Sequence, residues 1–204
     1  MNNLEKAYKK VDSLGEYSKE YFSYLAEVLL TIDEEEINKL GEIFESSSKN
    51  GNTIFVAGNG GSAATAMTMA NDIGFDIIKK TGTKNPFKVF SLVDNSSVIT
   101  AISNDVGYEN IFINQLKIHY KEGDCLIVIS ASGNSPNVLK AVEWVRSKGG
   151  KIIGFLGFTG GELLSLCDVS IHIKTKPGEY GPVEDAHLIM NHILAHWFQN
   201  KLVK

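Results

Sequence analysis

The chain has 204 residues, of which 43% are hydrophobic and 22% are charged, an ordinary balance for a folded globular protein. This composition excludes collagen-like and wholly disordered chains, and the length suffices for one domain with a substantial core. The formal net charge is −4, so the chain lacks the basic excess typical of duplex nucleic-acid binders, and we expect no nucleic-acid partner.

Apolar runs in this sequence are short. The longest of them, 152–158, falls far below the roughly 20 residues of a membrane span, and residues 1–20 have no apolar core of the signal-peptide type. We therefore expect a cytoplasmic protein without a membrane partner. Cys125 and Cys167 lie in or beside apolar runs and lack metal-ligand spacing, which predicts buried free thiols.

The first fifty residues have the pattern of two amphipathic helices. Apolar residues recur at spacings of three and four between Leu14 and Leu29, as they do on one face of a helix. Asp33 is placed to cap a second helix, with Glu36 as its capping-box partner. We expect a helical hairpin in residues 1–50 that covers either the domain itself or another subunit.

From residue 51 onward, predicted strands alternate with predicted helices. The runs expected to form strands are Thr53–Ala57, Phe87–Leu92, Cys125–Ser130, Lys151–Leu156 and Val169–Ile173. Helices are expected after most of them: from the turn after the first strand to about Lys80, over Tyr108–Lys121, up to about Lys148, briefly after Gly161, and from about Pro182 to the end. Such alternation implies crossovers and a parallel sheet. We predict one domain over 1–204, an α/β fold whose doubly wound five-stranded parallel sheet occupies 51–204.

Two polar, glycine-containing turns follow strands of this predicted sheet, and both precede helices. One runs from Gly58 to Ser62 and the other from Ser130 to Ser135. Ligands of open parallel sheets bind at the carboxyl ends of strands, and helix N-termini offer free N–H groups to anions. These residues could merely turn the chain and cap helices, since Ser135 before Pro136 is a natural N-cap. Two such turns in one sheet favour a phosphate cradle instead.

A nucleotide is a weaker candidate for this cradle than a phosphorylated small molecule. The sequence has no P-loop pattern, in which a Gly-Lys-Ser/Thr follows a glycine run. Gly58, Gly60 and Ala63 match the loose dinucleotide fingerprint, whose acidic partner should follow about 20 residues later. The candidate, Asp94, comes 31 residues after Ala63, which is too far for a good match.

Several motifs together resemble the sugar isomerase (SIS) domain family, with the greatest likeness to bacterial phosphoheptose isomerases. They are the two turns, Ser103–Glu109, Thr159–Gly161 and the ending Glu184-Asp185-Ala186-His187-x4-His192. The resemblance covers nearly the whole chain and implies the flavodoxin-like or Rossmann-like SIS fold and a homotetramer with active sites at subunit boundaries. It also implies isomerisation of sedoheptulose 7-phosphate to D-glycero-D-manno-heptose 7-phosphate through an enediol, a step of heptose biosynthesis.

The resemblance also implies roles for individual residues. Those expected to bind the phosphorylated sugar are Asn59, Gly60, Ser62, Ser130, Ser132 and Ser135, with Asp105 beside the sugar hydroxyls. The chemistry needs a base that removes a proton from the carbon beside the carbonyl, and an acid that handles the oxygens. Glu184 or Asp72 is the candidate base and His192 the candidate acid. Whether the sugar has six or seven carbons stays open.

This sequence departs from the family at two positions. Phosphoheptose isomerases usually have a zinc-binding histidine six residues after the first serine and a glutamate base ten residues after it, where this chain has Thr68 and Asp72. Threonine is a poor zinc ligand, so zinc binding is doubtful; His192 and Glu184 would hold a metal if one binds. Asp72 keeps the carboxylate on a side chain one methylene shorter, which can misplace a reacting group.

A non-catalytic role is the alternative. Some relatives in the family associate with the replication initiator protein, and the change at Thr68 fits a phosphosugar-binding or adaptor module of that kind. The retained Glu184 and His192 favour an enzyme. His119, His172 and His196 are expected to be structural, and His187 is open to either interpretation.

Overall fold

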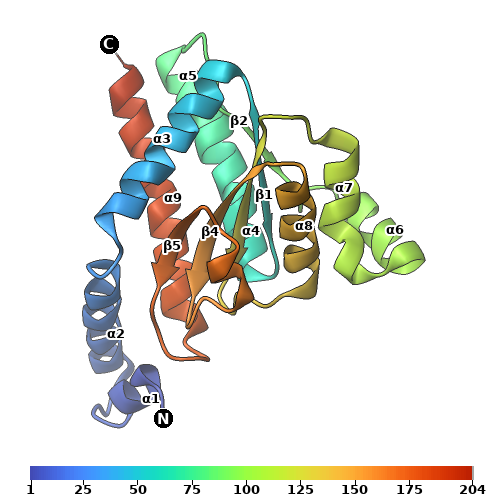
Figure 1. Cartoon of the computed structure of the whole chain (residues 1–204). Coiled ribbons are helices and arrows are strands. Elements are labelled where there is room, and N and C mark those ends of the chain that lie inside the picture. The colour runs from blue at the N-terminus through green and yellow to red at the C-terminus, as the bar shows by residue number, and fades with distance from the viewer. Residues whose placement is uncertain (204) are drawn as a thin grey trace.

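The computed structural model describes residues 1–203 and is built around a parallel sheet (Figure 1). Its five strands follow the order β2-β1-β3-β4-β5, and every neighbouring pair is parallel. They are β1 (Thr53–Gly58), β2 (Lys88–Ser91), β3 (Cys125–Ser130), β4 (Lys151–Gly157) and β5 (Val169–Ile173). The predicted α/β class, strand number and strand positions are therefore confirmed.

The described residues form nine α-helices. They are α1 (Asn3–Tyr8), α2 (Leu14–Leu29), α3 (Glu34–Asn50), α4 (Gly61–Met69), α5 (Ile77–Thr81), α6 (Ser96–Val106), α7 (Ile111–His119), α8 (Pro136–Ser147) and α9 (Tyr180–Leu202). A π-helical stretch, Ala70–Asp76, joins α4 to α5, and short 3-10 turns lie at Tyr108–Asn110 and Glu162–Ser165. Helices α1 and α6 were not predicted from the sequence, and α9 begins two residues earlier than expected.

Alternate residues of the three central strands, β1, β3 and β4, contribute to two separate cores, one on each face of the sheet. Ile54 and Val56 of β1 join a cluster with residues of α3, α4 and α9, whereas Phe55 and Ala57 join one with residues of α7 and α8. Successive side chains of a strand point to opposite faces, so strands covered on both sides need apolar residues throughout. The helices after β1 and β3 thus lie on opposite faces.

The leading helices do not form the expected hairpin. In Figure 1, α2 and α3 follow one another along one side of the molecule instead of folding back on each other. The buried carboxylate of Glu179, just before α9, supplies a reason: it accepts hydrogen bonds from the Asn3 backbone N–H and the Tyr24 hydroxyl. This contact holds α1 and α2 against the start of α9.

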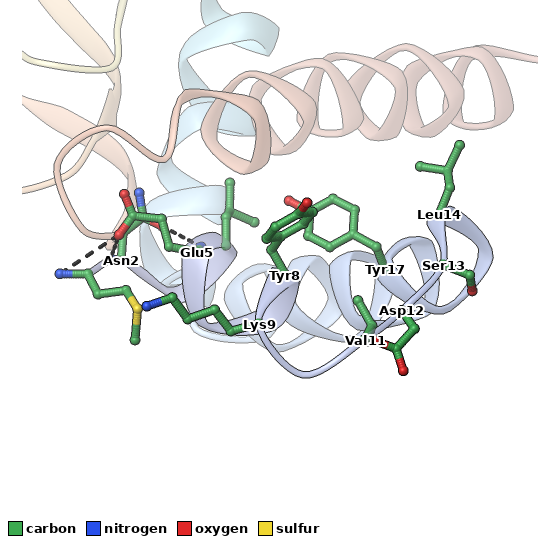
Figure 2. A pocket seen from close by; sticks show the side chains of 11 residues that line it. Asn2, Glu5, Tyr8, Lys9, Val11, Asp12, Ser13, Leu14 and Tyr17 are labelled. Atoms are coloured by element: carbon green, nitrogen blue, oxygen red, sulfur yellow. Dashed lines mark hydrogen bonds and ion pairs between the residues drawn. The ribbon is translucent and has the colours of Figure 1, made fainter.

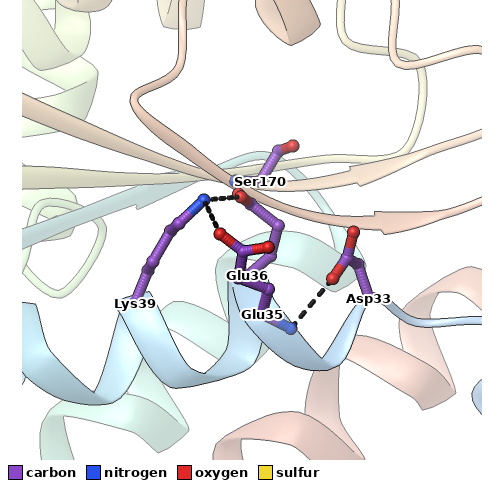
Figure 3. A network of polar contacts seen from close by, with 5 residues as sticks. All are labelled: Asp33, Glu35, Glu36, Lys39 and Ser170. Atoms are coloured by element: carbon purple, nitrogen blue, oxygen red, sulfur yellow. Dashed lines mark hydrogen bonds and ion pairs between the residues drawn. The ribbon is translucent and has the colours of Figure 1, made fainter.

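The start of α3 is fixed to the sheet rather than closed by a capping box. The Asp33 carboxylate caps the helix as predicted, accepting from the Glu35 backbone N–H at 2.9 Å. The Glu36 carboxylate instead accepts from the Ser170 backbone N–H at 2.8 Å and pairs with Lys39 (Figure 3). Ser170 belongs to β5, an edge strand with unpaired donors on its outer side, and this long-range bond satisfies one of them.

The cysteines behave as the composition predicted. Cys125 is buried and Cys167 partly buried, and both are free thiols. Burial raises the pKa of each thiol to about 12, so neither is ionised at neutral pH.

No helix within residues 1–203 combines the length and apolar character needed to cross a membrane.

Candidate active site

The two polar turns lie side by side where the order of the strands in the sheet reverses. β1 and β3 are neighbours in the sheet although β2 separates them in sequence, which makes their shared end a topological switch point. A pocket of about 170 Å³ lies there, and we name it the hydroxyl pocket. It is lined by Asn59, Ser62, Ile129, Ser130, Ala131, Ser132, Ser135, Tyr180 and Glu184.

The serine hydroxyl groups that line the hydroxyl pocket can still donate hydrogen bonds to a ligand. The Ser130 Oγ accepts from the Gly133 backbone N–H at 3.1 Å, and the Ser132 Oγ accepts from the Asn134 backbone N–H at 3.3 Å. Ser135 occupies the N-cap position of α8 as predicted, but its side chain makes no capping hydrogen bond. A hydroxyl that only accepts can still donate its hydrogen, and anionic oxygens bind donors.

A close glycine contact fixes the second turn. Gly133 has φ +67°, and a Cβ there would lie 1.9 Å from the carbonyl oxygen of Gly160. A residue with a side chain at this position would have to push the Thr159–Gly161 turn away. The predicted glycine motifs at the ends of β3 and β4 are therefore packed against each other.

Glu184 enters the hydroxyl pocket from α9 and lies on the first turn of α4. A Cβ on Gly61 would lie 2.4 Å from the Glu184 carboxyl group, so the carboxylate occupies space that only glycine leaves free. The N-terminus of α4 carries the positive end of the helix dipole, which favours a carboxylate there.

Tyr180 is a pocket residue that was not predicted from the sequence. It starts α9 and packs edge-on against Phe158, with 5.0 Å between ring centroids. Phe158 follows β4 with φ +48°, the single non-glycine residue with positive φ among those described. Bulky residues rarely adopt this conformation, and such strain is typical of functional sites. The only sequence signal was the position of both aromatics beside predicted turns.

Asp72 and His192 form a second group outside the hydroxyl pocket, which we name the Asp72–His192 pair. The His192 Nε2 lies 3.6 Å from the Asp72 Oδ2, within ion-pair range. The same oxygen accepts a hydrogen bond from the Asn191 Nδ2 at 2.8 Å. Asp72 lies in the π-helical stretch, a conformation found frequently at functional sites. Glu184 and His192 are eight positions apart on α9, about 12 Å of helical rise.

Two other predicted residues lie at the margin. Gly60 shapes the first turn with φ +55° just before α4 but does not line the hydroxyl pocket. Asp105 is exposed on α6, which follows edge strand β2, and its carboxylate accepts from Asn104. These observations do not test the expected roles of Gly60 and Asp105 in substrate binding, which stay predictions.

The donor set does not fit zinc. The Thr68 hydroxyl donates to the Ala64 carbonyl oxygen at 3.0 Å within its own helix. In residues 1–203 no three His, Cys, Asp or Glu side chains converge as metal ligands. Glu184 lines the hydroxyl pocket, whereas Asp72 and His192 do not. Zinc prefers four ligands of these types, so we derive no step through a metal.

Of the remaining histidines, His187 is fully buried. Its Nε2 donates to the Leu156 carbonyl oxygen, and burial lowers its pKa to about 4. Burial also lowers the pKa of His172, whose Nε2 bonds to the Phe158 carbonyl oxygen. Both are neutral at pH 7, and both have packing roles that fit the structural interpretation.

A separate hollow of about 920 Å³ lies in the angle between α1 and α2 (Figure 2). Its apolar lining includes Tyr8, Val11, Leu14 and Tyr17. It shares no residue with the hydroxyl pocket, so its size does not make it part of the candidate site.

Comparisons with known proteins agree with this geometry. Residues 16–157 match the model of the SIS domain. A phosphoheptose isomerase of Aneurinibacillus thermoaerophilus is 37% identical over 182 residues, covering 87% of each chain. One of Burkholderia pseudomallei (strain K96243) is 32% identical, covering 95% of this chain and 94% of the relative. The structure of phosphoheptose isomerase GmhA from Neisseria gonorrhoeae superimposes with a TM-score of 0.80 at 26% identity, covering 92% of this chain and all of that one.

Proposed function

Because this chain belongs to the SIS domain family, among the phosphoheptose isomerases, we propose that it is an aldose–ketose isomerase acting on sedoheptulose 7-phosphate. The observation that carries the proposal is the hydroxyl pocket, where serine hydroxyls from two turns converge with one carboxylate. Its product would be D-glycero-D-manno-heptose 7-phosphate.

The phosphate end of the substrate is anchored in the hydroxyl pocket. Ser130, Ser132 and Ser135 offer hydroxyl donors, and Ser62 lies opposite them in the first turn of α4. Charge-assisted hydrogen bonds of this type are about twice as strong as neutral ones. Anchoring one end of an extended sugar phosphate fixes where its carbonyl end lies, which supplies the positioning that isomerisation requires.

We assign proton transfer to Glu184 and His192, which belong to α9, and to Asp72, which contacts α9. A base takes the proton from the carbon beside the carbonyl and returns it to the neighbouring carbon, while an acid shuttles the proton between the two oxygens of the enediol. Glu184 has the advantage of lining the hydroxyl pocket. Asp72 has the advantage of lying beside His192, the candidate acid.

The active assembly that we propose is a cytoplasmic homotetramer with sites at subunit boundaries. The His192 side chain is half exposed and lines an outer hollow with the apolar residues Ile193 and Trp197. A second copy seated on this surface would shield the Asp72–His192 pair from water and complete the space for the carbonyl end of the sugar.

The test is turnover of sedoheptulose 7-phosphate by the purified chain, with and without added zinc. Glu184→Gln and Asp72→Asn each remove one candidate base while keeping similar volume. The true base is the one whose loss lowers kcat at least about a hundredfold with little change in substrate binding. A wild-type chain that turns over no phosphorylated ketose of five to seven carbons contradicts the proposal.

A second function is favoured by one observation, the absence of a converging metal-ligand set around Thr68 among the described residues. A non-catalytic phosphosugar-binding module would bind sedoheptulose 7-phosphate in the hydroxyl pocket and release it unchanged. Binding without turnover in the same experiment selects this alternative.

A further inference from the structure

The side chain of Asn59, in the turn after β1, is bound by two neighbours from other elements. Its Oδ1 accepts from the Tyr108 hydroxyl and from the Asn137 Nδ2, each at 2.8 Å. Its Nδ2 donates to the Asn137 Oδ1 at 3.0 Å. Asn137, in the first turn of α8, is only 2% exposed, so the two amides form a reciprocal pair that is shielded from water on one side.

A backbone group determines which way both amides point. The Val138 N–H donates to the Asn137 side chain at 3.0 Å, and a backbone N–H can only donate. The atom that it meets must therefore be the Asn137 oxygen, which places the Asn137 NH₂ opposite the Asn59 oxygen. That assignment fixes the Asn59 amide in turn, and it requires Tyr108 to be a donor.

Counting donors and acceptors shows what Asn59 can still offer to a ligand. Its oxygen has two lone pairs, and both are used by Tyr108 and Asn137. Its NH₂ group has two hydrogens, of which Asn137 takes one. One N–H remains, and Asn59 borders both the hydroxyl pocket and an adjoining hollow lined by Tyr108, Glu109 and Asn137.

We propose that Asn137 and Tyr108 are positioning residues that hold Asn59 as a donor-only group at the wall of the hydroxyl pocket. The ligand atom that Asn59 meets is then a hydrogen-bond acceptor, an oxygen of the phosphate group. This inference rests on the proposed function, because it takes the occupant of the pocket to be a sugar phosphate. Without the two positioning residues the Asn59 amide could rotate and present its oxygen, which repels a phosphate.

Tyr108→Phe is the primary test, because Tyr108 is 54% exposed and loss of its hydroxyl leaves the core intact. We expect the dissociation constant of inorganic phosphate, measured by calorimetry, to rise about fivefold, the effect of losing one hydrogen bond. The KM for sedoheptulose 7-phosphate should rise by a similar factor while kcat stays within about twofold, because Asn59 grips the phosphate in ground state and transition state alike. Tyr8→Phe is the matched control, since Tyr8 is exposed and lines a hollow that shares no residue with the hydroxyl pocket.

A double-mutant cycle separates positioning from a direct contact. If Tyr108 acts through Asn59, adding Tyr108→Phe to Asn59→Ala changes phosphate affinity no further than Asn59→Ala alone. Asn137→Ser keeps a polar group that cannot reach Asn59. In a chain that retains Asn59 it should weaken binding more than Tyr108→Phe does, and in a chain that already carries Asn59→Ala it should have no further effect.

Two results overturn the inference: unchanged phosphate affinity in Tyr108→Phe, or full additivity of Tyr108→Phe and Asn59→Ala. Either leaves the proposed function standing as long as the wild-type chain binds phosphate. A wild-type chain that binds neither phosphate nor sedoheptulose 7-phosphate removes the occupant itself, and then the proposed function fails together with the inference.

Discussion

At the scale of single residues, the candidate site depends on a glycine as much as on its polar side chains. The Glu184 carboxylate lies where the Cβ of any residue other than glycine at position 61 would be. Gly61 does not have a positive φ, so the backbone itself would accept alanine. What Gly61 provides is the space in which α9 brings its carboxylate onto the start of α4.

Gly61→Ala should therefore impair activity while sparing the fold. Alanine is the better helix former, so the melting temperature should not fall, but the new methyl group displaces the Glu184 carboxylate by about an ångström or more. A shift of that size costs on the order of a hundredfold in kcat/KM when the displaced group reacts. Gly41→Ala is the control, because nothing lies within 4 Å of a Cβ built on Gly41 in α3. Full activity in Gly61→Ala would remove Glu184 from the catalytic candidates.

At the scale of secondary-structure elements, the strands were predictable and several helical details were not. Runs such as Cys125–Ser130 are apolar throughout because both faces are covered, which leaves a strong signal in the sequence. α6 was missed although its apolar residues recur at helical spacing, and none of its residues is fully buried. The partnership of Glu36 with Ser170 was missed because a capping box is local in sequence, whereas β5 lies 134 residues away.

The bond between α3 and the sheet edge predicts a contrast between two adjacent glutamates. Glu36→Ala removes a charged acceptor from the Ser170 N–H and should lower the free energy of unfolding by about 2 kcal/mol. Glu35→Ala should change it by less than about 0.5 kcal/mol, because Glu35 forms only an exposed ion pair with Lys39. Urea denaturation of both variants measures the difference. Equal losses would show that the edge contact contributes nothing specific.

Most of the hydroxyl pocket could be predicted from the sequence, but its supports could not. The two turns are recognisable by glycines and hydroxyls at strand ends, and the structure brings five of the predicted residues together with Glu184. Asn137 and Tyr180 carried no such signal: an asparagine within the first turn of a helix and a tyrosine after a loop are ordinary residues in sequence. Their importance comes only from what folding places beside them.

At the scale of the whole molecule, apolar side chains are exposed on a group of elements that pack together. Met67 of α4, Phe75 of the π-helical stretch, and Ile193 and Trp197 of α9 each expose about half of their surface or more. A chain that remained a monomer would keep these residues in water, whereas a second copy would bury them. This surface adjoins the Asp72–His192 pair.

Trp197→Glu should therefore disrupt the proposed homotetramer. A buried charge without a partner opposes association, so we expect the mass measured by light scattering to fall to that of a dimer or monomer. The fold should survive, because Trp197 is 59% exposed in the single chain. Ile118→Glu is the control, since Ile118 is 73% exposed on α7 at the opposite face of the sheet. A wild-type chain that is monomeric would refute the proposed assembly.

The strand order also determines what a bound sugar phosphate does to the protein itself. The chain leaves β1 toward one face of the sheet and leaves β3 toward the other. A sugar phosphate bound by the two turns at the ends of these strands would therefore link the two helical layers without a covalent bond. Such a ligand binds only the native arrangement, and at a hundredfold excess over its dissociation constant it adds about 2.7 kcal/mol to stability. The concentration of substrate would then affect the stability of the folded protein as well as its turnover rate.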